Sequence, residues 1–129
     1  MSFLAKLNID DAEYMVMNFH LGMEQRLGTN GAAIQKPVGG ILSFELESSS
    51  TTDFFDWMVS PNKKKDGSIT FFRRDAMSRM RKVDFFEAIC FKFDEQYTSA
   101  GESAMTVKVS ISARKIQMED VFVENEWAV

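Results

Sequence analysis

The chain has 129 residues, of which 45% are hydrophobic and 26% are charged, and its formal net charge at pH 7 is −4. This size and composition predict one soluble domain that spans 1–129 and has a single core. No membrane-spanning helix is expected, because the sequence has no run of about 18 apolar residues.

Two features bear on the compartment in which the protein is found. The opening segment MSFLAKLNIDD lacks the basic region and apolar run of a signal peptide, so we expect the protein to begin in the cytoplasm. Cys90 is the single cysteine of the chain and cannot form an internal disulfide. This fits a reducing compartment.

Alternating residues at the start of the chain predict a hairpin of two long antiparallel strands. The first strand places four apolar residues on one face: Phe3, Ala5, Leu7 and Ile9. After a break at Asp10 and Asp11, a second apolar row follows: Met15, Met17, Phe19, Leu21 and Met23. The opposite row of that strand is mostly polar: Asn18, His20, Gly22 and Glu24. Each strand is therefore expected to bury one face.

A long loop is predicted over residues 26–40, which contain four glycines and one proline without any periodicity. Loops of this length are uncommon in compact domains and tend to be functional. A third strand follows over 42–46, with Leu42, Phe44 and Leu46 directed inward. Gly40 beside this strand indicates a close backbone approach.

Residues 51–60 predict one short helix. A capping box of the form S-x-x-D begins at Ser50, with Thr51 and Thr52 as alternative N-caps. Pro61 prevents the helix from continuing. Its large apolar side chains share one face: Phe54, Trp57 and Met58. A helix this short needs packing to be stable, so its aromatic side chains are expected to anchor it on the β-structure.

Further turns and a strand follow the helix. Residues 65–67 predict a turn that leads into a strand over 68–74. Residues 74–78 predict another short turn or a helical piece.

The last third of the chain continues the alternation. Apolar residues occupy both rows from 83 to 93, which predicts a strand buried on both sides. A clean alternation over 105–114 predicts another strand, and the apolar set within 116–122 predicts a closing one. The fold class expected from these elements is mainly β, a small antiparallel barrel with one helix around 51–60.

The charge is unevenly distributed along the sequence. The window 63–82 holds eight basic and two acidic residues, so it carries +6 and the remainder of the chain carries −10. Such a molecule can attract copies of itself head to tail, although neighbouring basic and acidic segments within one subunit explain the pattern equally well. If charge drives assembly, high salt or charge reversal at Arg73, Arg74 and Arg81 should weaken it.

Residues for catalysis, cofactors and metals are not grouped in this sequence. His20 and Cys90 are the only histidine and cysteine, and neither belongs to a nucleophile or metal motif. We therefore predict no catalytic residue, no cofactor and no metal site. Cys90 is expected to be a buried, inert thiol.

A monomeric barrel that binds a small ligand or single-stranded nucleic acid is the main alternative from another class. Phenylalanines and basic residues are interleaved between 71 and 85 and could imitate a stacking surface. The sequence pI of about 5.0 argues against nucleic-acid binding. The polar rows of the predicted strands fit either an ordinary solvated sheet surface or the wall of a wide channel shared by several subunits.

Four segments together resemble a known family in order and spacing: MSFLAKLNIDDAEY, KPVGGILSFELES, FFDWMVSPNKKKDGSITFFRRDAMSRM and VKVSISARKIQM. They are similar to the type VI secretion tube protein, the Hcp (TssD) family, in its Bacteroidetes form. The resemblance covers essentially the whole chain and is most specific between Phe54 and Met77. The loop segment TNGAAIQKP differs from the corresponding segment of the Bacteroidetes proteins. The resemblance therefore says least about the contacts that this loop makes.

The resemblance implies a small β-barrel with one flanking helix and a structural role without enzyme activity. It implies that six copies form a ring and that rings stack into the inner tube of a contractile apparatus. The implied partners are further copies of the chain, the sheath, spike and baseplate proteins, and effectors held in the lumen, with no nucleic acid and no membrane insertion. Assembly in the cytoplasm and secretion without a signal peptide follow from the same role. A tail-tube protein of a phage or other contractile particle is a related alternative.

Two groups of residues are assigned to this role. The polar rows suggest a set that faces the lumen: Asn18, His20, Lys108, Ser110 and Ser112. The loop and the basic window suggest a set that contacts other subunits or rings: Asn30, Gln35, Lys36, Lys63, Lys64, Lys65, Arg73, Arg74, Arg79 and Arg81.

Overall fold

A computed structural model describes residues 3–24, 27–32, 38–47, 52–73, 78–99 and 105–124. One helix and eight strands occur in this part of the chain. Their order is β1 (Phe3–Ile9), β2 (Ala12–Glu24), β3 (Val38–Glu47), α1 (Asp53–Val59), β4 (Lys65–Arg73), β5 (Ser78–Tyr97), β6 (Met105–Ser112), β7 (Lys115–Met118) and β8 (Val121–Glu124). The predicted mainly β composition and single short helix are confirmed.

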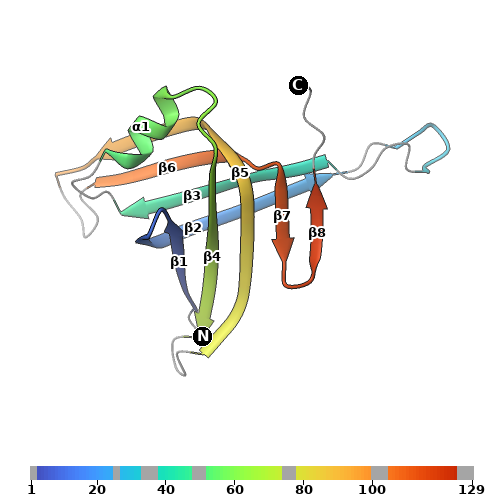
Figure 1. Cartoon of the computed structure of the whole chain (residues 1–129), viewed down its shortest axis with the longest axis horizontal. Helices are drawn as coiled ribbons and strands as arrows, with labels where there is room; N and C mark the ends of the chain where they lie inside the picture. Colours follow the sequence, from blue (N-terminus) through green and yellow to red (C-terminus); the bar gives the residue numbers. More distant parts are fainter. Residues whose placement is uncertain are drawn as a thin grey trace.

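All strands belong to one antiparallel sheet that closes on itself. The strand order is β4-β1-β2-β3-β6-β5-β7-β8, and an additional pairing of β4 with β5 joins six of the strands into a ring. Figure 1 shows β2, β3 and β6 running across β4 and the first half of β5. The β7–β8 hairpin continues the sheet outside the ring, because β7 pairs with β5. This closure is the arrangement expected of a small barrel.

β5 passes from one side of the ring to the other and changes its buried face on the way. Val83 and Phe85 are buried, but beyond Glu87, whose φ is +50°, the buried residues are Ala88 and Cys90. The register with β4 shifts at the same place, so Glu87 lies in a β-bulge. The prediction that both faces of this strand are buried was wrong, because the bulge moves the core row from one face to the other.

β2 contains a similar irregularity at Met17. Its register with β3 shifts between Val16 and Asn18. The side chains of Met15 and Met17 are each 44% exposed, whereas Val16 and Phe19 pack against the core. The predicted apolar row was therefore right only at Phe19 and Leu21, because Met23, which follows another register shift, is also exposed.

The core fills the closed sheet as the alternation predicted for β3 and β6. Leu42, Phe44 and Leu46 of β3 are buried. β6 contributes Val107, Val109 and Ile111. Gly40 has a φ of +89°, and its carbonyl oxygen accepts a hydrogen bond from Ala113 N at 2.9 Å, which confirms the close backbone approach.

α1 covers one end of the barrel and is anchored by its aromatic residues. Trp57 is 1% exposed, and its Nε1 donates a hydrogen bond to the carbonyl oxygen of Lys63 at 2.9 Å. Phe54 packs edge-on against Tyr14 of β2 with a ring separation of 4.9 Å. The helix ends before Pro61, as predicted. The predicted anchoring role of the helix is confirmed.

The start of α1 differs in detail from the prediction. Thr52 is the N-cap, and its side chain makes no capping hydrogen bond. Ser50 and Thr51, the other candidates for the cap, lie outside the described residues. The helix is instead tied to β2 by Tyr14, whose hydroxyl donates a hydrogen bond to Asp53 Oδ2 at 2.9 Å.

Alkaline titration should detect this link between α1 and β2. Burial, and then the hydrogen bond to Asp53 and the charge of that carboxylate, raise the pKa of Tyr14 from 10.0 to about 12. A raised pKa means that the fold favours the neutral phenol, so this stabilisation is complete below pH 10 and is lost as the pH rises toward 12.

We expect the ultraviolet absorbance of the protein to show a tyrosinate step near pH 12 that is missing in Tyr14→Phe. Tyr97 is the second tyrosine and provides the common background in both proteins. A difference titration centred at the ordinary value of 10.0 would contradict the assignment.

Candidate functional site: a polar hollow and two open strand edges

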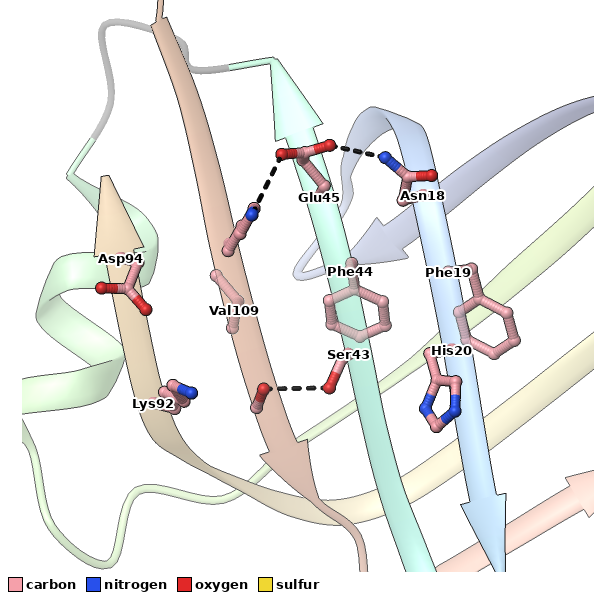
Figure 2. Close-up of a pocket in the computed structure, with 11 residues that line it drawn as sticks. Asn18, Phe19, His20, Ser43, Phe44, Glu45, Lys92, Asp94 and Val109 are labelled. Carbon is pink, nitrogen blue, oxygen red and sulfur yellow. Dashed lines mark hydrogen bonds and ion pairs between the residues drawn. The ribbon is translucent and has the colours of Figure 1, made fainter. Parts of the chain in front are cut away.

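A polar surface covers the outer face of the layer formed by β2, β3, β6 and β5. The strand registers align its side chains in two rows across the layer. One row contains His20, Ser43, Ser110 and Lys92. The next row contains Asn18, Glu45, Lys108 and Asp94. Figure 2 shows these side chains gathered on one side of the four strands. They point outward because successive residues of a strand alternate between its faces.

The two rows line a hollow of about 410 Å³, which we name the polar hollow. Its floor is held by contacts between neighbouring strands (Figure 2). The hydroxyls of Ser43 and Ser110 share a hydrogen bond of 2.9 Å. Asn18 Nδ2 donates to Glu45 Oε1 at 2.5 Å, and Lys108 Nζ lies 3.9 Å from Glu45 Oε2. The hollow therefore carries both signs of charge and several hydrogen-bonding groups, beside the apolar lining residues Phe19, Phe44 and Val109.

The residues that the sequence assigned to a lumen lie together on this face. Asn18, His20, Lys108 and Ser110 line the polar hollow. Ser112 lies one row further along the same face, opposite Ile41. The structure thus brings the five residues onto one surface, and their role in a lumen stays a prediction.

Lys92 and Asp94 also line the polar hollow, and the sequence reasoning missed them. Both follow a second shift in β5, where the register with β6 changes between Cys90 and Lys92. Their alternation with Phe91 and Phe93 was a usable signal. The signal was missed because apolar residues in both rows of this strand led to the prediction that both of its faces are buried.

Two edges of the four-stranded layer are open within the described part of the chain. β1 pairs with β2 only through residues 12–16, so no described strand pairs with the outer edge of 17–24. On the far side, β4 reaches β5 only as far as Ala88, so no described strand pairs with the outer edge of 89–97. Backbone N–H and C=O groups at an edge without a strand partner can form hydrogen bonds with a strand of another chain.

Exposed large apolar side chains occur along the two strands that carry these edges. On β2 they are the methionines Met15, Met17 and Met23. On β5 and on α1, which packs against β5, they are Phe91, Tyr97, Phe55 and Val59. Because exposed apolar clusters mark contact surfaces, both edges are candidates for subunit contact.

The basic residues of the window 63–82 do not form a single region. Lys65 and Arg73 are the first and last residues of β4, so they are about 26 Å apart. Arg81 pairs with Phe71 and lies toward the same end as Arg73. The two halves of the window therefore lie at opposite ends of an extended strand, and a charge-driven contact between subunits stays a prediction.

The lysines beside α1 are engaged within the subunit. Lys63 Nζ lies 2.6 Å from Asp56 Oδ2, and this pairing raises the pKa of Lys63 and lowers that of Asp56. Lys65 Nζ lies 2.5 Å from Asp10 Oδ2 and 5.6 Å from the centre of the Trp57 ring. Lys64 is exposed and also has an interaction partner. These contacts favour the alternative in which basic and acidic segments neighbour each other in one subunit.

Part of the predicted contact set lies outside the described residues. This applies to Gln35, Lys36, Arg74 and the side chain of Arg79. Residues 74–78, predicted as a turn or helical piece, are described only at Ser78, which begins β5. The predicted turn at 65–67 is instead the start of β4.

The described piece of the long loop extends away from the barrel. Residues 27–32 project beyond the ends of β2 and β3, at the right of Figure 1. Gly28 N donates to Ala32 O at 2.8 Å, and Asn30 Oδ1 accepts from Ala32 N at 3.0 Å. This small turn leaves Leu27 61% exposed.

Within the described residues, no three His, Cys, Asp or Glu side chains are grouped so that they could hold a metal ion. Cys90 is buried, as expected, and its Sγ donates to the carbonyl oxygen of Lys92 at 3.6 Å. Burial raises the pKa of the Cys90 thiol, so the reactive thiolate is disfavoured. No helix in the described ranges is both long and apolar enough to cross a membrane.

Comparisons with known proteins agree with this geometry. The family model for hemolysin coregulated protein Hcp (TssD) matches residues 1–128. The structure of Hcp1 from Flavobacterium johnsoniae is similar, with 31% sequence identity and a TM-score of 0.88, over 95% of this chain and 99% of that chain. A search of curated proteins gave no match.

More distant structures share the fold. Hcp1 from Salmonella typhimurium has 15% identity and a TM-score of 0.77, over 95% of this chain and 92% of that chain. Hcp3 from Pseudomonas aeruginosa has 11% identity and a TM-score of 0.67, over 99% of this chain and 100% of that chain. The chain therefore belongs to the Hcp (TssD) family, the structural tube proteins that type VI secretion systems secrete.

Proposed function

We propose that six copies of this chain form a ring and that such rings stack into the inner tube of a contractile type VI secretion apparatus. The observation that carries the proposal is the pair of open edges on one four-stranded layer. The two edges differ, since one belongs to β2 and the other to β5. A contact between unlike edges is head to tail, and a head-to-tail contact that closes produces a ring.

Pairing of β2 with β5 of a neighbouring copy would extend the layer from subunit to subunit. It would also cover the apolar clusters, because methionines flank one edge and aromatic side chains flank the other. Methionine sulfur packs favourably against aromatic rings, so the two clusters suit each other chemically. The backbone hydrogen bonds would give affinity, and these side chains would set the register.

The polar hollow indicates which face the ring would enclose. The layer is hollowed on the face that carries the two polar rows. Layers joined edge to edge and curved toward this face would place the polar rows of every subunit on the inner wall. The lumen would then be hydrophilic, which suits the passage or holding of effectors, and nothing in this role requires catalysis.

The remaining surfaces would contact the adjacent rings of the stack and the proteins outside the tube. The projecting loop with Asn30, and Arg73 and Arg81 at the far end of β4, would contact an adjacent ring. Sheath, spike and baseplate proteins would then contact the assembled tube. Rings would form in the cytoplasm and leave the cell through the apparatus, without a signal peptide.

A test of ring formation introduces charge at both open edges. We expect Met23→Asp combined with Tyr97→Asp to abolish rings, because burying either carboxylate at a subunit contact is unfavourable. Both residues are exposed in one subunit, at 47% and 68%, so folding should be preserved. Native mass spectrometry and negative-stain electron microscopy measure assembly, and circular dichroism measures folding.

Ile41→Asp is the matched control, since Ile41 is 46% exposed but lies on the central strand β3. It should keep its rings. A wild-type protein that is monomeric at high concentration, or rings that persist in the double variant, would refute the proposed contact.

A further inference from the structure

Two methionines lie on the open stretch of β2, residues 17–24, with which no described strand pairs on the outer side. Met17 is 44% exposed and Met23 is 47% exposed. Met17 lies at the register shift between Val16 and Asn18, and Met23 follows the shift after Gly22. Solvent therefore reaches both side chains in the single subunit.

Several other sulfur-containing side chains are less exposed or lie elsewhere. Met15 is also 44% exposed, but it pairs with Lys6 of β1 and so lies outside the open stretch. Met58 and Met118 pack against the core. Cys90 is buried, and burial raises the pKa of its thiol, so the reactive thiolate is disfavoured. An oxidant therefore reaches the thioethers of the open stretch before it reaches the sulfur atoms of the core.

Oxidation turns such a thioether from an apolar group into a polar one. Hydrogen peroxide transfers one oxygen atom to the sulfur, its O–O bond breaks, and the remainder leaves as water. The sulfur is oxidised to a sulfoxide while the peroxide is reduced. Methionine sulfoxide reductases reverse the change, because a pair of thiols supplies two electrons and two protons and the oxygen leaves as water.

We propose that Met17 and Met23 form an oxidation site through which hydrogen peroxide prevents a free subunit from joining a ring. Burying a polar sulfoxide at the contact with β5 of another copy is unfavourable, and the packing of methionine sulfur against aromatic rings is lost. Once the contact has formed, the same side chains are covered, so assembled rings resist the oxidant. The inference rests on the proposed function, in which the open stretch of β2 pairs with β5.

Oxidation rates test the difference between the free subunit and the ring. Tyr97→Asp supplies the free subunit, because it places a carboxylate at the end of β5 and leaves β2 unchanged. Peptide mass spectrometry after treatment with hydrogen peroxide measures the sulfoxide at each methionine. Met17 and Met23 should be oxidised at least about tenfold faster in Tyr97→Asp than in wild-type rings, whereas Met15 should differ by less than about twofold.

Glutamine substitution tests the consequence for assembly, because its side chain is polar and close in length to methionine sulfoxide. We expect Met17→Gln combined with Met23→Gln to lower the yield of rings in native mass spectrometry at least about fivefold. Met15→Gln is the matched control, since it makes the same change at a similarly exposed residue that is already paired with β1. It should keep the wild-type yield. Circular dichroism measures the folding of each variant.

Three outcomes would overturn the inference. They are equal oxidation of Met17 and Met23 in rings and in free subunits, a wild-type yield of rings from the double variant, and an equal loss of rings in Met15→Gln. Any of these results with a wild-type protein that forms rings rejects this inference alone. A wild-type protein without rings rejects the proposed function and this inference with it.

Discussion

Replacing Trp57 with alanine is expected to lower the free energy of unfolding by about 3–5 kcal/mol. Trp57 is 1% exposed and is among the largest fully buried side chains of the core. The substitution leaves a cavity at the end of the barrel and removes the Nε1 hydrogen bond to the carbonyl oxygen of Lys63. It also removes the ring above which the Lys65 ammonium lies. Urea denaturation followed by far-ultraviolet circular dichroism measures the loss.

Phe55→Ala is the control for this prediction. Phe55 belongs to the same short helix but is 54% exposed, and its ring contacts Phe93 at a separation of 5.9 Å. Its loss should lower the free energy of unfolding by no more than about 1 kcal/mol. Because subunit contacts add to apparent stability, both substitutions are best compared in the Met23→Asp and Tyr97→Asp background. Equal losses for the two aromatic residues would contradict the anchoring role of Trp57.

The helix was predictable because its signals are local. The i, i+3, i+4 spacing of Phe54, Trp57 and Met58 and the stop at Pro61 need no knowledge of the rest of the fold. The tie to Tyr14 was not predictable in this way, since it joins residues 39 positions apart in the sequence. A hydroxyl in an alternating strand carries no sign of its partner.

The buried rows of β2 and β5 were predictable only between their bulges. An inserted residue moves all following side chains to the opposite face, and the sequence marks this weakly when both rows contain apolar residues. Met17 and Phe91 are such cases, since each lies at a register shift and extends an apolar row. Glu87 gave a clearer signal, because a charged residue interrupted the apolar alternation there.

The candidate site was predictable where polar residues alternate without interruption. β6 shows this pattern, and Lys108 and Ser110 lie together on its polar face, as the alternation predicts. In the basic window, closeness in the sequence does not give closeness in space. Along an extended strand each residue adds about 3.3 Å, so Lys65 and Arg73 end at opposite ends of β4.

Gly67 lies where the sequence suggested a turn, and the strand found there makes it sensitive to any side chain. A Cβ at this position would lie 2.6 Å from Phe85 Cζ, 2.7 Å from the carbonyl oxygen of Asn8 and 2.8 Å from Ile9 Cγ1. Phe85 is fully buried, and Asn8 O belongs to the paired backbone of β1, so neither can yield easily. We therefore expect Gly67→Ala to lower the free energy of unfolding by about 1–3 kcal/mol through overpacking.

Gly22→Ala is the matched control for Gly67→Ala, because both glycines lie within strands of the same sheet. The nearest atom to a Cβ at Gly22 is His20 Cε1 at 3.3 Å, and this exposed side chain is able to rotate away. The free energy of unfolding of Gly22→Ala should stay within about 0.5 kcal/mol of the wild-type value. Urea denaturation of both variants decides the comparison. If Gly67→Ala is as stable as Gly22→Ala, the close packing of β4 against β1 and Phe85 is wrong.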